Sequence, residues 1–125
     1  MEISCGVDII EISRIKKSIE ESEDRFLQRV YTYKEIEYCE SRNKQKYQHY
    51  AARFAAKEAV FKAISNKLEN KYDIEWKNIE IINDKEGRPY INFIDIEIKE
   101  IDQIDISISH CREYAVANVV AILRH

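Results

Sequence analysis

Two acidic residues stand where acidic side chains are uncommon. Asp8 lies within GVDIIEI, a stretch rich in β-branched residues, and Glu58 lies within FAAKEAVFKA, an alanine-rich segment that is apolar on almost every side. Because aspartate is depleted in strand interiors, Asp8 is either a turn residue at a strand end or a carboxylate directed at a ligand. Glu58 could pair with Lys62 four residues later on a helix surface. The apolar residues around Glu58 instead favour a bound cation as its partner, because burying a charge without a partner costs free energy.

Two carboxylates suit a hard divalent ion. Magnesium commonly takes one or two protein carboxylates and completes its shell with water and substrate phosphates. We therefore predict that Asp8 and Glu58 share a metal ion and that the substrate carries phosphate. The basic residues available to meet that phosphate are Lys44, Lys46, Arg53, Lys62 and His110. Each of these, taken singly, is more often a solvated surface charge than a ligand. Lys57 is expected to reach along its helix into solvent.

The first half of the chain reads as one strand followed by helices. Residues 3–12 predict a strand, and Ser13 predicts the cap of a helix that turns Ile12, Ile15 and Ile19 to one side.

A second helix is indicated by the T-x-x-E capping box of Thr32 and Glu35, and it should run to about Ser41. The alanine-rich segment predicts a long helix from about Lys44 to Ser65.

The second half reads as strands. KNIEII and YINFIDIEI alternate and are joined by a turn that contains Gly87 and Pro89, and IDISISH precedes the nearly continuous apolar run YAVANVVAIL. We therefore predict a single α+β domain over residues 1–125, with an N-terminal strand, helices grouped in the first half and antiparallel strands in the second half.

The amino-acid composition limits the classes of function that this protein could have. Twenty Lys and Arg against 23 Asp and Glu give a net charge of −3, which argues against a general nucleic-acid binder. The start MEISCGVDII lacks the pattern of a signal peptide, and no run is long and apolar enough to cross a membrane. Cys5, Cys39 and Cys111 are odd in number and far apart, so we predict small apolar fillers in a cytoplasmic protein rather than disulfides.

Several segments together carry a family resemblance. GVDIIEI, RVYT with Glu35, RFAAKEAVFKA, the GRP turn and SISHC occur in this order over nearly the whole chain. They resemble the holo-acyl-carrier-protein synthases, the small bacterial 4'-phosphopantetheinyl transferases. The most specific part is the pairing of G-x-D, at Gly6 to Asp8, with F-x-x-K-E-x-x-x-K, at Phe54 to Lys62.

The resemblance implies a role for each candidate residue. Asp8 and Glu58 would hold the magnesium ion that bridges the diphosphate of coenzyme A, and Lys62 would steady the departing phosphate. The adenosine-side phosphates would be held by a set of basic residues and by the residue after the histidine, where the family usually has a hydroxyl: Lys44 or Lys46, Arg53, His110 and Cys111.

The resemblance also implies partners. The family docks an acidic acyl carrier protein through a basic residue at the position of Arg14, and Lys17 lies on the same outer side of the predicted helix. The family assembles as a trimer with active sites between neighbours, so a homotrimer is expected.

The reaction implied is transfer of the 4'-phosphopantetheine arm of coenzyme A to a serine of apo acyl carrier protein, in fatty acid biosynthesis. Adenosine 3',5'-bisphosphate is released, and either Glu58 or a metal-bound water takes the serine proton. Two other readings remain open from the residues alone. One is a non-enzymatic α+β module that binds a nucleotide or a protein, and the other is a different magnesium-dependent phosphohydrolase.

Overall fold

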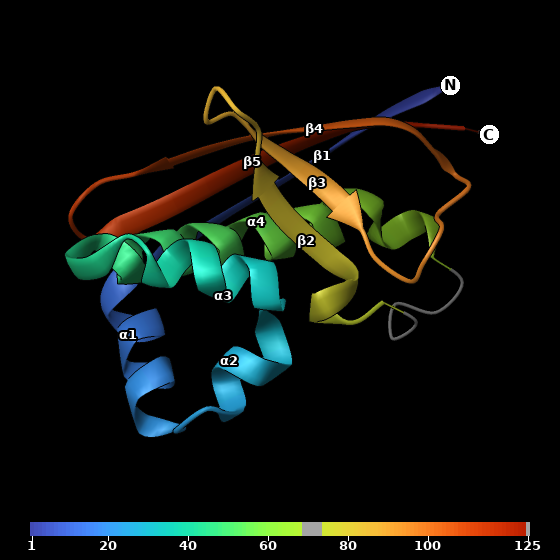
Figure 1. Cartoon of the computed structure of the whole chain (residues 1–125). Helices are drawn as coiled ribbons and strands as arrows, with labels where there is room; N and C mark the ends of the chain where they lie inside the picture. Colours follow the sequence, from blue (N-terminus) through green and yellow to red (C-terminus); the bar gives the residue numbers. More distant parts are fainter. Residues whose placement is uncertain (69–73, 125) are drawn as a thin grey trace.

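The computed structural model describes residues 1–68 and 74–124 (Figure 1). Its strands are β1 (Glu2–Glu11), β2 (Ile79–Asn83), β3 (Pro89–Phe93), β4 (Ile101–His110) and β5 (Tyr114–Leu123). Its α-helices are α1 (Ile12–Glu21), α2 (Arg25–Val30), α3 (Tyr33–Glu40) and α4 (Lys46–Ile64), and the 3₁₀ turns are η1 (Asn43–Gln45), η2 (Ser65–Lys67) and η4 (Trp76–Asn78). None of the helices in these two ranges has the length and apolar character needed to cross a membrane.

The long helix α4 lies across one face of a three-stranded antiparallel sheet (Figure 1). The sheet has the order β1-β5-β4, so the first and last strands of the chain are neighbours. Alternate residues of β5 are buried against α4, and most of them are small: Ala115, Ala117, Val119, Ala121 and Leu123. The alanines of α4 meet them, and small side chains on both surfaces allow close packing.

The hairpin β2–β3 forms a separate two-stranded sheet that crosses in front of α4 in Figure 1. Its turn depends on Gly87, whose φ of 86° is the left-handed conformation that glycine adopts without strain. The predicted turn at Gly87 and Pro89 is confirmed. The predicted second strand YINFIDIEI was too long, because β3 ends at Phe93 and residues 94–98 pass to β4 without strand pairing.

Helices α1, α2 and α3 gather at the N-terminal end of α4. Ile12 and Ile15 are buried there, which confirms the predicted inner side of α1. Ser13 does not cap this helix: α1 begins at Ile12 directly after β1, and its first turn has no side-chain cap. The Thr32–Glu35 capping box of α3 is confirmed in both of its hydrogen bonds. The short helix α2 was not predicted.

The predicted fold class, α+β with the helices early and antiparallel strands late, is confirmed. Asp8 does not end a strand, because β1 continues through it and pairs it with Ala117 of β5. The reading of Asp8 as a turn residue at a strand end was therefore wrong.

Candidate active site

An acidic and basic cluster lies where β1 passes under α4. The Nζ atom of Lys62 donates to Oδ1 of Asp8 at 3.1 Å and to the carbonyl oxygen of Val7 at 3.0 Å. The Lys62 side chain is about half exposed, whereas the Asp8 side chain is 18% exposed. Lys62 thus reaches from the helix to the strand, and a phosphate that arrived at this edge could compete for its ammonium group.

Glu58 belongs to the same cluster. Its side chain is half-buried, and burial raises its pKa; the neighbouring Asp8 carboxylate raises the pKa further, whereas the Lys62 ammonium lowers it. The effect of Asp8 on the pKa of Glu58 means that the two carboxylates lie close enough to repel each other. Two converging carboxylates are the donor set that a hard divalent cation prefers, so these residues fit a magnesium ion.

Gly6 explains why the two carboxylates can meet. A Cβ atom at Gly6 would lie 2.0 Å from the carbonyl oxygen of Ala59 and 2.8 Å from the amide nitrogen of Ala63, so only glycine lets β1 approach α4 this closely. Asp8 is two residues farther along the strand and therefore on the same face. The G-x-D motif thus combines a close helix–strand contact with a carboxylate beside it.

Lys57 does not extend into solvent, which corrects the expectation from sequence. It is fully buried, and its Nζ atom lies 2.7 Å from Oε1 of Glu35. The same ammonium group donates to the carbonyl oxygens of Val30 at 2.8 Å and of Trp76 at 3.0 Å. Burial lowers the pKa of Lys57, and the Glu35 carboxylate opposes that shift. With three acceptors for its three N–H bonds, this lysine ties α4 to α2, α3 and η4.

The carboxylate of Glu35 is the centre of this buried network. Its Oε1 also accepts from the amide of Thr32 at 2.9 Å, and its Oε2 accepts from the amide of Ile81 at 2.9 Å. The hydroxyl of Thr32 lies 2.6 Å from Oε2 of the buried Glu80. Because Lys57 is pinned in this network, the rotation of α4 is fixed, and Glu58, about 100° farther around the helix, is held toward β1.

A second basic group lies on another side of α4. Arg53 is only 3% exposed; it donates to Oδ1 of Asn83 at 2.7 Å, and its guanidinium carbon lies 4.2 Å from the centre of the Tyr38 ring. The Nε atom of Arg53 is buried without a hydrogen-bond partner within the described residues. A hollow of about 470 Å³ lies between α3 and the β2–β3 turn, and its charged lining residues are Lys34, Arg42, Arg53, Lys85, Glu37 and Asp84. Four basic residues against two acidic ones give this hollow an excess of positive charge, which favours an anion.

His110 lies next to this basic group. Its ring centre is 5.7 Å from that of His49, and the ring of His49 in turn lies edge-on to Tyr38 at 5.5 Å. Burial lowers the pKa of His49 to about 4, and the positive charges of Arg53, His110 and Arg42 add to that effect. Arg53 and His110, chosen separately from the sequence, are thus brought into one neighbourhood.

The other candidates lie apart from these contacts. Lys46 is paired with Glu40 at 3.4 Å, and Lys44 is exposed in η1. Arg14 and Lys17 are exposed on α1.

The expectation that all three cysteines fill apolar space was correct for Cys39 alone. Cys39 is buried, which raises its pKa to about 12, whereas Cys5 and Cys111 are exposed. Cys5 lies on the face of β1 that points away from α4, and Cys111 follows the end of β4.

The acidic cluster and the basic group do not face each other within one chain. Asp8 is on β1 at one edge of the sheet and His110 is on β4 at the other edge, with β5 between them. On α4, Glu58 and Arg53 are five residues apart, which separates them by about 140° around the helix. No group of three or more His, Cys, Asp or Glu side chains forms a metal cluster within residues 1–68 and 74–124.

Sequence reasoning missed Tyr38, His49 and Asn83. Asn83 is the first residue of the turn NDKEG, whose composition predicts a loop but gives no reason to select this residue. Tyr38 and His49 belong to different helices, so only the packing of α3 on α4 brings them together.

Comparison with known proteins adds a second line of evidence. The model of the 4'-phosphopantetheinyl transferase superfamily matches residues 4–119. A holo-[acyl-carrier-protein] synthase of Ruminiclostridium cellulolyticum is 46% identical over 128 aligned residues, which cover 98% of this chain and 94% of that protein.

Two solved structures have the same arrangement. A holo-(acyl-carrier-protein) synthase from Bacillus anthracis, in complex with coenzyme A, is 34% identical with a TM-score of 0.76, and 94% of each chain is covered. A holo-[acyl-carrier-protein] synthase of Helicobacter pylori, also in complex with coenzyme A, is 29% identical with a TM-score of 0.81, over 94% of this chain and 99% of that one.

Proposed function

The chain belongs to the 4'-phosphopantetheinyl transferase superfamily, and on this premise we propose how its residues carry out the reaction. It is an enzyme of the holo-[acyl-carrier-protein] synthase type, which transfers phosphopantetheine from coenzyme A to acyl carrier protein. The non-enzymatic reading left open by the sequence is thereby excluded. We further propose that residues 1–125 act as one catalytic domain, in the cytoplasm and in fatty acid biosynthesis.

The observation that carries the mechanism is the meeting of Asp8, Glu58 and Lys62 at the crossing of β1 and α4. Asp8 and Glu58 would hold a magnesium ion, which supplies positive charge against the diphosphate of coenzyme A. A bound cation would also oppose the burial and the repulsion by Asp8 that raise the pKa of Glu58.

Lys62 would act on the leaving group. The serine hydroxyl of the carrier protein gives its proton to Glu58 or to a water molecule as its oxygen attacks the phosphorus attached to the pantetheine arm, and the bond from that phosphorus to the bridging oxygen breaks. Adenosine 3',5'-bisphosphate then leaves with extra negative charge. The Lys62 ammonium, now 3.1 Å from Asp8 and half exposed, can turn to this phosphate and stabilise that charge.

Arg53 and His110 would hold the adenosine-side phosphates. Cys111, together with Lys44 or Lys46, would contact the same phosphates from the edge of this site. The buried Nε atom of Arg53, which has no hydrogen-bond partner among residues 1–68 and 74–124, supports an anion at this place. Since the acidic cluster and the basic group face different ways on α4, we propose that one substrate molecule spans two neighbouring subunits. Each subunit would supply the acidic cluster to one site and the basic group to another.

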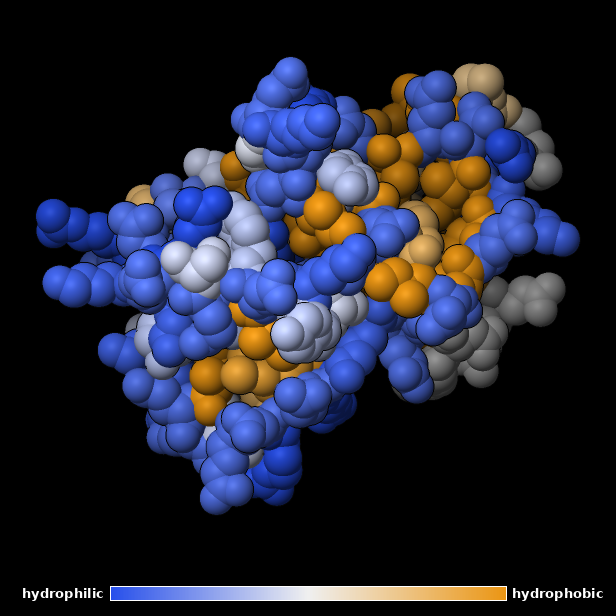
Figure 2. All heavy atoms as spheres, in the orientation of Figure 1, coloured by the Kyte–Doolittle hydropathy of each residue, from blue (hydrophilic) through white to orange (hydrophobic). Residues whose placement is uncertain are grey.

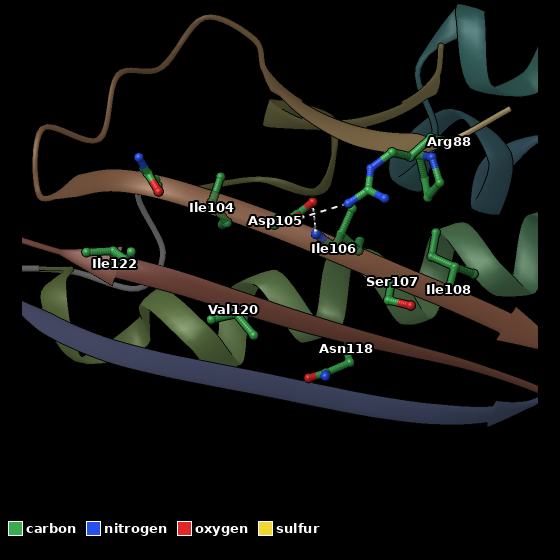
Figure 3. A pocket seen from close by; sticks show the side chains of 11 residues that line it. Arg88, Ile104, Asp105, Ile106, Ser107, Ile108, Asn118, Val120 and Ile122 are labelled. Atoms are coloured by element: carbon green, nitrogen blue, oxygen red, sulfur yellow. Dashed lines mark hydrogen bonds and ion pairs between the residues drawn. The ribbon is translucent and has the colours of Figure 1, made fainter. Parts of the chain in front are cut away.

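The face of the sheet opposite α4 supports a homotrimer. On β1 this face carries Val7, 57% exposed, and Ile9, 64% exposed. Val120 and Ile122 of β5 continue it beside a hollow of about 720 Å³, over which Arg88 reaches to Asp105 (Figure 3). An exposed apolar sheet face of this kind is typical of an interface between subunits.

The decisive test is intact-mass analysis of apo acyl carrier protein incubated with coenzyme A, magnesium and the enzyme. Wild type should add one phosphopantetheine and release adenosine 3',5'-bisphosphate; a phosphohydrolase would leave the carrier mass unchanged. Glu58→Gln should abolish the transfer with little change in the thermal melt. Glu97→Gln, an exposed glutamate between β3 and β4, is the matched control and should stay active. Transfer at the wild-type rate by Glu58→Gln would refute the metal role.

A further inference from the structure

Asn83 is the last residue of β2, and the proposed reaction assigns no part to it. We propose that Asn83 is a positioning residue: its side chain holds the Arg53 guanidinium in the orientation that meets coenzyme A, and Glu35 holds Asn83 against α4. The proposal rests on the function proposed above and adds to it a residue that acts through Arg53.

The Arg53 guanidinium is held at two places. Its Nη2 atom donates to Oδ1 of Asn83 at 2.7 Å, and its carbon lies 4.2 Å from the centre of the Tyr38 ring. Arg53 is 3% exposed, so its side chain has little room for other orientations. Because the guanidinium is a rigid planar group, contacts at one nitrogen and at the central carbon together restrict its rotation.

The side-chain amide of Asn83 is fixed from its other end. Its Nδ2 atom donates to the carbonyl oxygen of Gly87 at 3.0 Å, across the turn between β2 and β3. The same turn is closed by Oδ1 of Asp84, which accepts from the amides of Glu86 and Arg88, both at 2.9 Å. The donor of the Asn83 amide thus belongs to the turn, and this contact directs its acceptor oxygen at the arginine.

Glu35 ties β2 to α4 two residues before Asn83. In an antiparallel pair of strands, every second amide points away from the partner strand, and the amide of Ile81 donates to Oε2 of Glu35 at 2.9 Å. Oε1 of this carboxylate lies 2.7 Å from Nζ of Lys57. Lys57 and Arg53 are four residues apart and therefore lie on the same side of α4.

The strand β2 is therefore attached to one side of α4 at two points, at Ile81 through Glu35 and at Asn83 through Arg53. Side chains alternate between the two faces of a strand, so a shift of β2 by one residue would turn Asn83 away from Arg53. The buried carboxylate thus fixes the strand position at which the asparagine meets the arginine.

A group that is already held in its binding orientation loses less conformational entropy when the substrate arrives. Without the Asn83 contact, the Arg53 charge remains but the guanidinium can turn, so the affinity for coenzyme A falls. The reacting centre at Asp8, Glu58 and Lys62 is untouched. Because the lost binding is the same in the bound substrate and in the transition state, the KM for coenzyme A rises and kcat stays unchanged.

A double-mutant cycle tests the proposal, with the Kd of coenzyme A measured by isothermal titration calorimetry in the presence of magnesium. Asn83→Ala should raise the Kd about three- to tenfold, the cost of ordering one long side chain. Arg53→Ala should raise it at least as much. In the Arg53→Ala background, Asn83→Ala should change the Kd by less than about twofold, because no guanidinium is left to position.

Steady-state kinetics of Asn83→Ala should show the same rise in the KM for coenzyme A and a kcat within about twofold of wild type. Asn92→Ala makes the same change on β3, where the exposed side chain donates to Glu80, and should keep the wild-type Kd. Asn83→Leu, which keeps the shape of the side chain, takes the place of Asn83→Ala in the cycle if circular dichroism shows the alanine variant to be unfolded.

Three results would overturn the proposal and leave the transferase function intact. They are equal effects of Asn83→Ala in both backgrounds, a lowered kcat with an unchanged KM, and an equal loss of affinity in Asn92→Ala. An unchanged Kd in Arg53→Ala would overturn both the proposal and the assignment of Arg53 to coenzyme A. Loss of the transferase function itself would appear separately, as an unchanged carrier mass with the wild-type enzyme.

Discussion

At the scale of single residues, the charged residues of α4 that the sequence singled out have three different roles in the structure. They are Lys57, Glu58 and Lys62. Lys57 and Glu58 are adjacent, yet Lys57 is sealed in the interior with Glu35 while Glu58 lies beside Asp8 at the edge of the sheet. Lys62, one turn after Glu58, crosses to the strand and pairs with Asp8. Of the charged residues of this helix, Lys57 therefore stabilises the fold, whereas Glu58 and Lys62 form the site.

Removing Lys62 should raise the pKa of Glu58. The Lys62 ammonium lowers that pKa, whereas burial and the Asp8 charge raise it, so Lys62→Met leaves only the raising influences. A ¹³C NMR titration of glutamate side chains in the metal-free protein measures this pKa. Magnesium binds the ionised carboxylate, so the affinity for magnesium falls when Glu58 becomes protonated. As the pH is lowered, this loss of affinity should begin at a higher pH in Lys62→Met than in wild type. Lys77→Met is the control, and an unchanged or lower Glu58 pKa in Lys62→Met would contradict the electrostatic account.

Removing Lys57 should destabilise the whole protein. Lys57→Met leaves the Glu35 carboxylate buried without a counter-charge, which costs about 3–5 kcal/mol when one partner of a buried pair is lost. Urea unfolding monitored by circular dichroism gives the free energy of unfolding. The double variant Lys57→Met with Glu35→Gln should recover part of the loss because the remaining side chain is neutral. A loss under about 1 kcal/mol in the single variant would mean that the ion pair contributes little.

At the scale of elements, the crossing of β1 and α4 depends on small residues. Alanines line the sheet-facing side of α4, and Gly6 lies directly beneath Ala59. The hydroxyl of Ser4 donates to the carbonyl oxygen of Ala63 at 2.6 Å and fixes the same contact from the other end. The distance between helix and strand therefore sets the distance between Asp8 and Glu58.

Gly6→Ala should separate the helix from the strand. Its new Cβ atom meets backbone atoms that cannot rotate away, so we expect a loss of about 3 kcal/mol or more and weaker magnesium binding. Gly87→Ala is the matched control: its Cβ meets nothing within 4 Å, and only the positive φ costs about 1 kcal/mol. Thermal melts and a magnesium titration of both variants decide the matter. A smaller effect at Gly6 than at Gly87 would show that the crossing is not tight.

The outer side of helix α1 is the surface expected to bind the protein substrate. Arg14 and Lys17 are exposed on it, and Figure 2 shows apolar side chains gathered between α1 and α2 with charged ones around them. We expect this surface to dock an acidic carrier protein. Arg14→Glu should raise the KM for apo carrier protein several-fold and weaken its salt dependence, with a smaller effect from Lys17→Glu.

Steady-state kinetics at low and high salt measure both effects. The KM for coenzyme A should stay unchanged in the α1 variants, and Lys99→Glu, an exposed lysine between β3 and β4, serves as the charge control. An equal loss for both substrates would indicate a general defect instead of a docking surface.

At the scale of the whole molecule, the prediction concerns shared sites. If each site uses Glu58 of one subunit and His110 of its neighbour, the inactive Glu58→Gln and the impaired His110→Ala proteins should restore activity when mixed. Some mixed interfaces then carry both intact groups. Light scattering should give a trimer mass, and subunit exchange is verified by mass spectrometry of labelled protein. A monomer mass, or no recovery after exchange, would contradict the arrangement.

The sequence by itself determined most of the secondary structure, though not the short helix α2 or the end of β3, and it singled out the acidic pair. Periodicity located β1, α4, β4 and β5 closely, because amphipathic alternation and alanine-rich runs are local properties. Asp8 and Glu58 were found because each violates the preference of its surroundings, a signal that needs no contact information.

Only the tertiary structure decided which partners these residues meet. Lys57 and Glu58 differ by one position and have opposite fates, because the packing of α2, α3 and η4 on one side of α4 buries the first and leaves the second at β1. Burial lowers the pKa of His49, and the charges of Arg53, His110 and Arg42, which lie up to 61 positions away in the chain, lower it further. Such contacts join segments that are distant in sequence, so a local sequence pattern cannot reveal them. The close packing of α4 on the sheet is the physical reason why these residues meet the partners that they do.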